Sequence, residues 1–244
     1  MKNRKGIILA GGLGTRFFPV TKGLSKHLLP IFDKPMIYYS LSTLMLANIR
    51  DILLISTSRD IPIFKELLGN GDNWGLKINY LVQESPDGIA QALIISEEYL
   101  AGSPSVLILG DNFFYGDGLQ KRLLKVSSKN NGATIFCCKV KDPERYGIAE
   151  IDSNGNVTNL IEKPNVVNSN YAISGIYFYD EYASKYAREL LPSARGELEI
   201  TDLNKIYLEK GNLSLEKLGR GYAWLDAGTP DSLLEAFQFV QTIE

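Results

Sequence analysis

A short apolar run at residues 7–10 leads directly into a glycine-rich turn, and this transition constrains the fold most strongly. Three glycines stand within residues 11–14. Because glycine has no Cβ atom, the backbone of such a turn can approach a bulky anion, and consecutive N–H groups can form an anion-binding nest. Arg16 and Lys26 add two positive charges after the turn. The pattern therefore predicts a buried strand that ends at a polyphosphate site.

Two well-known phosphate-binding loops do not fit this turn. A P-loop has the form GxxxxGK[ST], but Phe17 stands five positions after Gly12, where the second glycine belongs. The dinucleotide fingerprint GxGxxG fits Gly12 and Gly14, and it also meets Phe17 in place of its third glycine. Asp33 lies at a plausible distance for a ribose contact, but the interior Pro30 argues against a central strand there. The turn thus indicates a third kind of nucleotide-binding loop.

Strand-like apolar runs alternate with helix-like segments in the first half of the chain. We expect strands at residues 6–10, 52–56, 78–82 and 106–109, and helices at residues 36–47, 61–68 and 89–100. This alternation predicts a doubly wound α/β fold, because helices that join parallel strands cover both faces of the sheet. Ligands in such sheets bind at the carboxyl ends of the strands, where the glycine turn and Asp111 lie.

Strand-rich segments dominate after residue 131. We expect strands at residues 133–140, 148–151, 157–161 and 172–179, with a hairpin turn at 153–156, and helices at residues 181–190, 200–210 and 231–241. No low-complexity linker separates the two halves. The sequence therefore predicts a single domain with a mixed, mostly parallel sheet.

Composition excludes several function classes. A formal net charge of −2 offers no basic face for nucleic acid, and no apolar run is long enough to span a membrane. The apolar run after the basic start ends at Gly11, too short for a secretory signal. We expect a cytoplasmic protein whose Cys137 and Cys138 are core thiols rather than redox or metal sites.

A set of short motifs follows in order along the whole chain. They are Gly11-Gly12-Leu13-Gly14-Thr15-Arg16, Ser25-Lys26, Leu28-Leu29-Pro30, Lys34-Pro35-Met36-Ile37-Tyr38-Tyr39, Ser85-Pro86-Asp87-Gly88-Ile89-Ala90-Gln91-Ala92, Leu109-Gly110-Asp111-Asn112, Glu162-Lys163-Pro164, Pro192-Ser193-Ala194-Arg195-Gly196-Glu197 and Trp224-Leu225-Asp226-Ala227-Gly228-Thr229. Together they resemble the motifs of the sugar-1-phosphate nucleotidylyltransferases, and most closely those of the thymidylyltransferases that act on glucose 1-phosphate.

The resemblance implies a Rossmann-like nucleotidyltransferase fold. Residues from about 1 to 130 would form a nucleotide-binding half, and residues from about 131 to 244 a sugar-phosphate-binding half. The implied reaction transfers a thymidylyl group from dTTP to α-D-glucose 1-phosphate with Mg²⁺, and it yields dTDP-glucose and pyrophosphate. The implied setting is dTDP-rhamnose and surface polysaccharide biosynthesis. The resemblance also implies a homodimer or homotetramer with no nucleic-acid or membrane partner.

The resemblance also assigns roles to individual residues. The catalytic residues would be Arg16, Lys26 and Lys163, and the metal ligands Asp111 and Asp226. The nucleotide would contact Leu9, Gly11, Gly12, Gly14, Thr15, Gln83, Pro86, Gly88 and Asp111. The sugar phosphate would contact Asn112, Tyr146, Gly147, Glu162, Lys163, Gly175 and Arg195.

The chemistry of the charged residues agrees with these roles. Polyphosphate transfer depends on a metal ion and on positive charge. Arg16 can supply this charge as a bidentate fork and Lys26 as a point charge. Asp111 and Asp226 each follow an apolar run and could share one Mg²⁺, although either could instead cap a helix or a turn. His27 is the single histidine, which excludes a multi-histidine metal site, and we expect it to be a loop residue.

Other assignments leave alternatives open. Arg195 could bind phosphate or form a structural link to Glu197 or Glu199. Gln83 could read the edge of thymine or uracil, or cap the following helix, and Gly88 would leave room for the base. The rival functions are a nucleotidylyltransferase that prefers UTP or another sugar 1-phosphate, and a catalytically silent nucleotide-sugar sensor. A sensor would not need the full set of charges.

The sequence ends at Glu244, shortly after the helix expected at residues 231–241. In the family it resembles, longer members continue with helices that help to form a second nucleotide-sugar site between subunits. We therefore expect a short form without this extension, which is active but weakly inhibited, or not inhibited, by dTDP-rhamnose.

Overall fold

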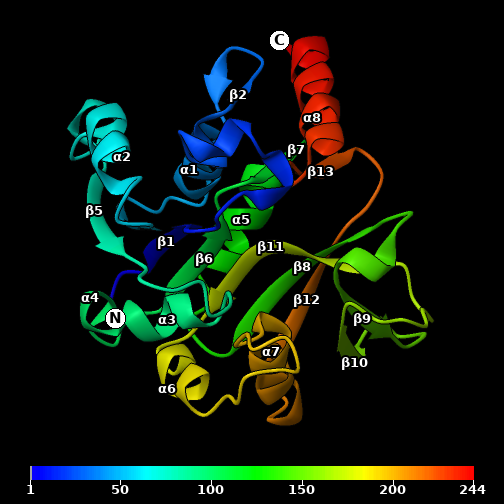
Figure 1. Cartoon of the computed structure of the whole chain (residues 1–244). Coiled ribbons are helices and arrows are strands. Elements are labelled where there is room, and N and C mark those ends of the chain that lie inside the picture. Colours follow the sequence, from blue (N-terminus) through cyan, green and yellow to red (C-terminus); the bar gives the residue numbers. More distant parts are fainter. Residues whose placement is uncertain (1) are drawn as a thin grey trace.

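A nine-stranded sheet runs through both halves of the chain (Figure 1). The computed structural model describes residues 2–244. The strands of the main sheet are β1 (Lys5–Ala10), β4 (Asp51–Ser56), β5 (Lys77–Val82), β6 (Ser105–Leu109), β8 (Ala133–Lys139), β9 (Gly147–Ile151), β10 (Val157–Glu162), β11 (Tyr171–Tyr179) and β12 (Leu213–Leu218). Two small ribbons accompany it: β7 (Asn112–Gly116) pairs with β13 (Tyr222–Asp226), and β2 (Pro30–Ile31) pairs with β3 (Lys34–Pro35).

Helices cover both faces of this sheet. One face packs against α1 (Ile37–Leu46), α2 (Ile61–Leu68) and α5 (Leu119–Ser127). The other packs against α3 (Gln91–Ile95), α4 (Glu97–Leu100), α6 (Ala183–Arg188) and α7 (Ile200–Glu209). The last helix, α8 (Pro230–Ile243), packs on β2 and β13 at the top of the view in Figure 1. Among residues 2–244, no helix combines the length and the apolarity needed to cross a bilayer.

The central strands are apolar because both of their faces are buried. In β1, Ile8 packs into the core beneath α1 and α2, while its neighbour Ile7 packs into the core beneath α3 and α7. Ile108 and Leu107 of β6 divide between the two cores in the same way. A strand buried on both faces needs apolar residues at successive positions, which explains the near-continuous apolar runs of the sequence. The predicted doubly wound α/β architecture is confirmed.

The order of the strands brings two loops to one edge of the sheet. Strand β1 lies between β4 and β6 and is parallel to both. The carboxyl ends of β1 and β6 are level, since Leu9 pairs with Leu109 and the N–H of Gly110 donates to the Leu9 carbonyl at 2.9 Å. The glycine turn and Asp111 therefore leave the sheet side by side, as the sequence predicted.

Some predicted elements differ from the structure. The helix expected at residues 89–100 is divided at Ser96 into α3 and α4, and the Ser96 hydroxyl donates to the Leu93 carbonyl at 3.3 Å. Such a bond competes with the regular helical pattern. The expected hairpin is present between β9 and β10, where the Asp152 carboxylate accepts the N–H groups of Asn154 and Asn156. The strands and α-helices that the sequence analysis did not predict are β2, β3, β7, α5, β12 and β13.

Candidate active site

Lys26 and Asp111 form an ion pair at the carboxyl edge of the sheet. The Lys26 ammonium donates to the Asp111 carboxylate, and both side chains are largely buried. Lys26 comes from the loop after β1, and Asp111 follows β6. The parallel pairing of these strands brings the two loops to one edge of the sheet, because each loop begins where its strand ends. The structure thus brings together two of the charges that the sequence singled out.

Asp226 reaches the same place from the other half of the chain. It is the last residue of β13 and stands opposite Asn112 in the antiparallel pair with β7. The N–H of the next residue, Ala227, donates to the Asp111 carbonyl at 3.0 Å. The alternative of Asp226 as a helix cap is wrong, since Thr229 caps α8 and its hydroxyl accepts the Ser232 N–H.

The two carboxylates differ in their electrostatics. Burial and the adjacent Asp111 raise the pKa of Asp226 to about 6. Burial would also raise the pKa of Asp111, but Lys26 outweighs it and holds that pKa below its usual range. The pair therefore carries more negative charge than Lys26 alone can balance, which a divalent cation would relieve. Among residues 2–244 no group of three or more His, Cys, Asp or Glu side chains could hold a metal. Two carboxylates completed by phosphate oxygens are nonetheless a donor set that suits Mg²⁺.

The side-chain amide of Asn112 forms hydrogen bonds with Asp111 and with two residues close to it. Its Nδ2 donates to Asp111 Oδ1 at 2.9 Å, while its Oδ1 accepts the Gly175 N–H at 3.0 Å and the Trp224 indole N–H at 2.5 Å. Gly175 must be a glycine here, because a Cβ atom would lie 2.5 Å from Asn112 Oδ1. Asn112 thus orients Asp111 and connects it to the wall of a neighbouring cavity.

This cavity has a volume of about 170 Å³. It is lined by the predicted site residues Arg16, Asp111, Asn112, Tyr146, Gly147, Glu162, Lys163, Gly175 and Asp226. Pockets for drug-sized ligands usually measure roughly 300–1,000 Å³, so this one suits a ligand of monosaccharide size. The residues predicted for a sugar pocket therefore line one cavity, which strand ends of both halves of the chain form.

Lys163 also lines the cavity, and its backbone has an unusual conformation. Its φ of 40° is rare for a residue with a side chain and often marks a functional site. Its N–H donates to the Tyr146 carbonyl at 3.0 Å, and its ammonium lies 3.7 Å from the Glu162 carboxylate. The turn after β10 thus holds the Lys163 charge at the cavity.

Arg195 forms the structural link to neighbouring glutamates that the sequence analysis gave as an alternative to phosphate binding. Its guanidinium binds both oxygens of Glu199 at 2.8 and 2.9 Å, and it lies 3.3 Å from Glu197 and 3.4 Å from Glu162. These carboxylates already neutralise the charge of Arg195. Its predicted contact with phosphate remains a hypothesis.

Of the predicted nucleotide-side residues, Gln83 lies against the glycine turn. Gly14 has a φ of 63°, which glycine adopts without strain. A Cβ atom on Gly11 would lie 2.1 Å from Gln83 Oε1, so the Gln83 amide lies directly against the turn. Its Nε2 donates to the Gln91 side-chain oxygen on α3. The N-terminus of α3 has no side-chain cap, so Gln83 does not cap this helix, and its contact with a base stays a prediction. Gly12, Thr15 and Pro86 are exposed, and Leu9 is half-buried at the end of β1.

Gly88 has a structural reason to be a glycine. Its φ is 109°, and a Cβ atom would lie 2.4 Å from the Leu198 carbonyl oxygen. The backbone of Leu198 crosses at this point and bonds to Asp87 and Ala90. The expected room for a base is therefore not needed to explain this glycine.

His27 is buried rather than exposed in its loop. Its Nδ1 lies 2.9 Å from the Ser25 hydroxyl, and 2% of the residue is exposed. Burial and the neighbouring Lys26 lower the pKa of His27 to about 3. The ring is therefore neutral at physiological pH and belongs to the packing behind the ion pair.

Sequence reasoning missed several residues that line the cavity, of which four are polar or aromatic: Arg145, Tyr177, Thr201 and Trp224. Thr201 donates to the Glu162 carboxylate, and the rings of Trp224 and Tyr146 lie 5.1 Å apart. Trp224 and Thr201 stand within or beside quoted motifs, so the motifs themselves were the available signal. No local signal marks Arg145.

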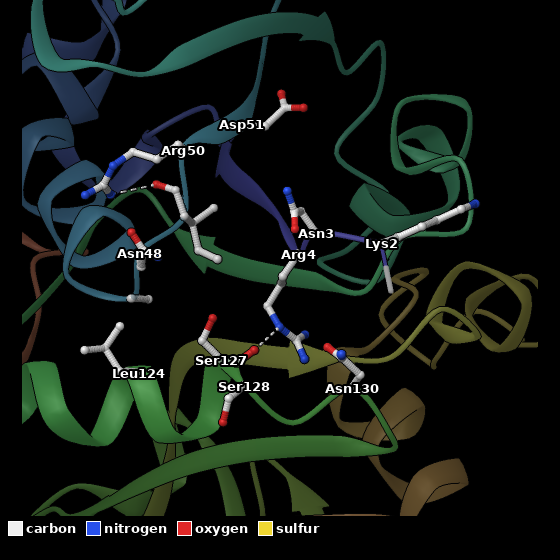
Figure 2. A pocket seen from close by; sticks show the side chains of 12 residues that line it. Lys2, Asn3, Arg4, Asn48, Arg50, Asp51, Leu124, Ser127, Ser128 and Asn130 are labelled. Atoms are coloured by element: carbon white, nitrogen blue, oxygen red, sulfur yellow. Dashed lines mark hydrogen bonds between the residues drawn. The ribbon is translucent and has the colours of Figure 1, made fainter.

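A larger cavity, of about 620 Å³, lies at the opposite edge of the sheet (Figure 2). It is lined by residues that precede β1 and β4, among them Arg4 and Arg50. Figure 2 shows Arg4 donating to the Ser127 carbonyl, and its guanidinium also binds the carbonyls of Ser105 and Tyr179. Because these cations are already bound to backbone carbonyls, the smaller cavity is the better candidate for an active site.

Comparison with known proteins identifies the family of the chain. The nucleotidyl transferase family model matches residues 5–243. A glucose-1-phosphate thymidylyltransferase from Xanthomonas campestris pv. campestris (strain B100) is 59% identical over 244 residues, which are 100% of this chain and 83% of the relative. One from Neisseria gonorrhoeae is 55% identical over 240 residues, 98% of this chain and 83% of the relative.

Solved structures show the same fold. A Bacillus anthracis protein assigned to the glucose-1-phosphate thymidylyltransferases, solved with sucrose, superposes with a TM-score of 0.91 and is 41% identical. The alignment covers 99% of this chain and 96% of that one. A UDP-glucose pyrophosphorylase solved with UDP-glucose has a TM-score of 0.85 at 22% identity, with 100% of both chains covered, and it supports the fold alone.

Proposed function

Since the chain belongs to the nucleotidyl transferase family, among the glucose-1-phosphate thymidylyltransferases, we propose that it makes dTDP-glucose and pyrophosphate from dTTP and glucose 1-phosphate. One observation carries the proposal. Arg16, Asp111, Lys163 and Asp226 line one sugar-sized cavity, and the Lys26 ammonium pairs with Asp111. These cations and carboxylates are the groups that a triphosphate, a metal ion and a sugar phosphate need around a reacting phosphorus.

In this proposal the glycine turn and Arg16 bind the triphosphate. The exposed turn can offer N–H groups to phosphate oxygens, and Arg16 lines the cavity and can bind two oxygens at once. Lys26 contributes a second cation whose position is fixed by Asp111. Such preorganised charge is the main contribution that proteins make to phosphoryl transfer.

Lys163 would bind the phosphate of the sugar on the other side of the reacting phosphorus. A phosphate oxygen of the sugar phosphate forms the new bond to the α-phosphorus, and the bond between the α- and β-phosphates breaks to release pyrophosphate. A phosphomonoester has a second pKa of about 6, so the attacking group is already an anion near pH 7. No general base is required, in agreement with the neutral, buried His27.

Asp111 and Asp226 would hold a Mg²⁺ ion between the protein and the phosphates. When bound, the ion would neutralise phosphate charge. Two carboxylates together with substrate oxygens suffice to position such an ion. The raised pKa of Asp226 supports this role. It results from burial and from repulsion by Asp111, and a bound cation would remove the repulsion.

A matrix assay tests the proposal. The purified protein is incubated with dTTP, UTP, ATP, CTP or GTP, each with a panel of sugar 1-phosphates and Mg²⁺, and pyrophosphate release is measured. We expect the highest kcat/KM for dTTP with glucose 1-phosphate, and no turnover after chelation by EDTA. A higher kcat/KM with UTP would transfer the proposal to a uridylyltransferase, and no turnover with any pair would refute it.

A further inference from the structure

The loop that carries Arg16 and Lys26 lies outside the main sheet, so other contacts must fix its shape. Within it, the Thr21 hydroxyl donates to the Gly14 carbonyl at 2.7 Å, and Thr21 is 1% exposed. This bond joins the two ends of residues 14–21, a segment that includes the exposed Arg16. The position of Thr21 therefore affects the position of the glycine turn and of Arg16.

Arg59, in the turn between β4 and α2, holds this unit from outside. Its Nη1 donates to the carbonyls of Thr21 and Lys22, both at 3.2 Å. Its remaining donors bind Asp60, with Nε at 2.7 Å from Oδ1 and Nη2 at 3.0 Å from Oδ2. One guanidinium thus connects the loop to the amino-terminal end of α2.

Asp60 gives Arg59 a fixed base. Its side chain is fully buried and also accepts the Thr57 hydroxyl at 3.0 Å. A buried carboxylate that is bound by a bidentate arginine and a hydroxyl has little freedom to move. Arg59, which is itself half-exposed, is therefore held in one orientation, with Nη1 directed at the loop.

We propose that Arg59 is a positioning residue for nucleoside triphosphate binding, which acts through Thr21 on the glycine turn and Arg16. This inference rests on the proposed function, since it assumes that the turn binds the triphosphate. Only a guanidinium can bind both carboxylate oxygens and two carbonyls at once, because its donors form a rigid planar fork. A lysine at this position keeps the charge near Asp60 and loses the contacts with the loop.

Steady-state kinetics of Arg59→Lys test the inference. We expect the KM for dTTP to rise about 5- to 10-fold, the effect of one or two lost hydrogen bonds, while the KM for glucose 1-phosphate stays within about twofold. Calorimetric titration with dTTP should show the same loss of affinity. The matched control is Arg188→Lys, which alters an exposed pair with Glu97 and should leave both KM values unchanged. An unchanged KM and affinity for dTTP in folded Arg59→Lys would overturn the inference.

Thr21 provides an independent test if the Arg59 variant does not fold. Thr21→Val removes the hydroxyl and should reproduce the selective rise in the KM for dTTP, whereas Thr21→Ser keeps the hydroxyl and should restore the parent value. Equal kinetics of the Val and Ser variants would overturn the inference. The two proposals fail separately: an inactive parent refutes the proposed function, and an active parent with unchanged variants refutes only the role of Arg59.

Discussion

Asp226 and Asp111 lie side by side because Asp226 pairs with Asn112 across the β7–β13 ribbon, and the Ala227 N–H binds the Asp111 carbonyl. Their proximity depends on backbone pairing and is present without any ligand. The free protein therefore bears the repulsion between the two carboxylates, which is one reason for the raised pKa of Asp226.

Asp111→Asn and Asp226→Asn should each abolish most activity in a folded protein. Each change keeps the shape of the side chain and removes the charge proposed to hold Mg²⁺. Loss of one such electrostatic contact costs on the order of 10²–10³ in rate. Turnover is measured by pyrophosphate release and folding by circular dichroism. Asp231→Asn, on the exposed first turn of α8, is the matched control and should keep full activity. Near-normal turnover in either site variant would contradict the metal hypothesis.

Arg16→Ala and Lys163→Ala should separate the two cationic ends of the site. Arg16→Ala should lower kcat for every nucleotide, because its proposed partner is the triphosphate. Lys163→Ala should raise the KM for glucose 1-phosphate and also slow transfer, because its proposed partner is the attacking phosphate. Both substrates are varied in steady-state kinetics. A Lys163→Ala enzyme with the parent's dependence on glucose 1-phosphate would remove that residue from the sugar-phosphate site.

Asn112→Ala should lower the free energy of unfolding. It leaves the Gly175 N–H and the Trp224 indole N–H without their acceptor, and each buried donor left unsatisfied costs about 1–3 kcal/mol. Urea unfolding followed by tryptophan fluorescence measures the change. Asn168→Ala removes an exposed amide that bonds to Glu150 at 3.3 Å, and as the control it should change the free energy by less than about 0.5 kcal/mol. A similarly small change in Asn112→Ala would show that water replaces the lost acceptor.

His27 should remain neutral across the range in which an exposed histidine titrates. Its pKa is about 3 in the folded protein, against an ordinary value of 6.5, because of burial and the adjacent Lys26. Since it is the single histidine, its ring protons can be followed by NMR without ambiguity. We expect no titration shift between about pH 8 and 5. A midpoint near 6.5 would show that the ring is accessible to water.

The same pKa predicts a contribution to stability with a definite sign. The folded protein favours the neutral ring, so the contribution is fully present above pH 6.5 and is lost as the pH falls toward 3. Each pH unit in this window changes the free energy of unfolding by up to about 1.4 kcal/mol. Unfolding curves of the parent and of His27→Gln should therefore differ in pH slope between about pH 6 and 4. Parallel slopes would contradict the assignment.

The strands that are buried on both faces could be predicted from the sequence. β1, β4 and β6 carry apolar residues on both faces, so their patterns stand out locally. The ribbon strands β7 and β13 could not be predicted in this way, because they pair only with each other and lie far apart in the chain. The first three residues of β7 are buried and those of β13 are half-buried, so neither strand shows alternating burial. Only the folded structure shows that they join Asp226 to Asp111.

The charges of the candidate site could be predicted better than its geometry. Arg16 and Lys26 were recognised because they stand beside an unusual glycine turn, and Lys163 because of its motif. Arg145 lies in a polar turn that resembles any surface segment, and only the folding of β9 and β10 brings it close enough to Asp226 to interact. The role of Arg195 in phosphate binding stays a prediction, since neighbouring glutamates bind its guanidinium in the structure.

The place of β11 in the sheet has a consequence for synthesis on the ribosome. This strand, made after two-thirds of the chain, pairs with β6 on one edge and β8 on the other. Until Tyr179 has emerged, β6 presents an open, apolar edge, which is the kind of surface that recruits other chains. Nascent chains stalled or cleaved before Tyr171 should therefore bind chaperones or aggregate, whereas chains that extend past Tyr179 can close the central sheet.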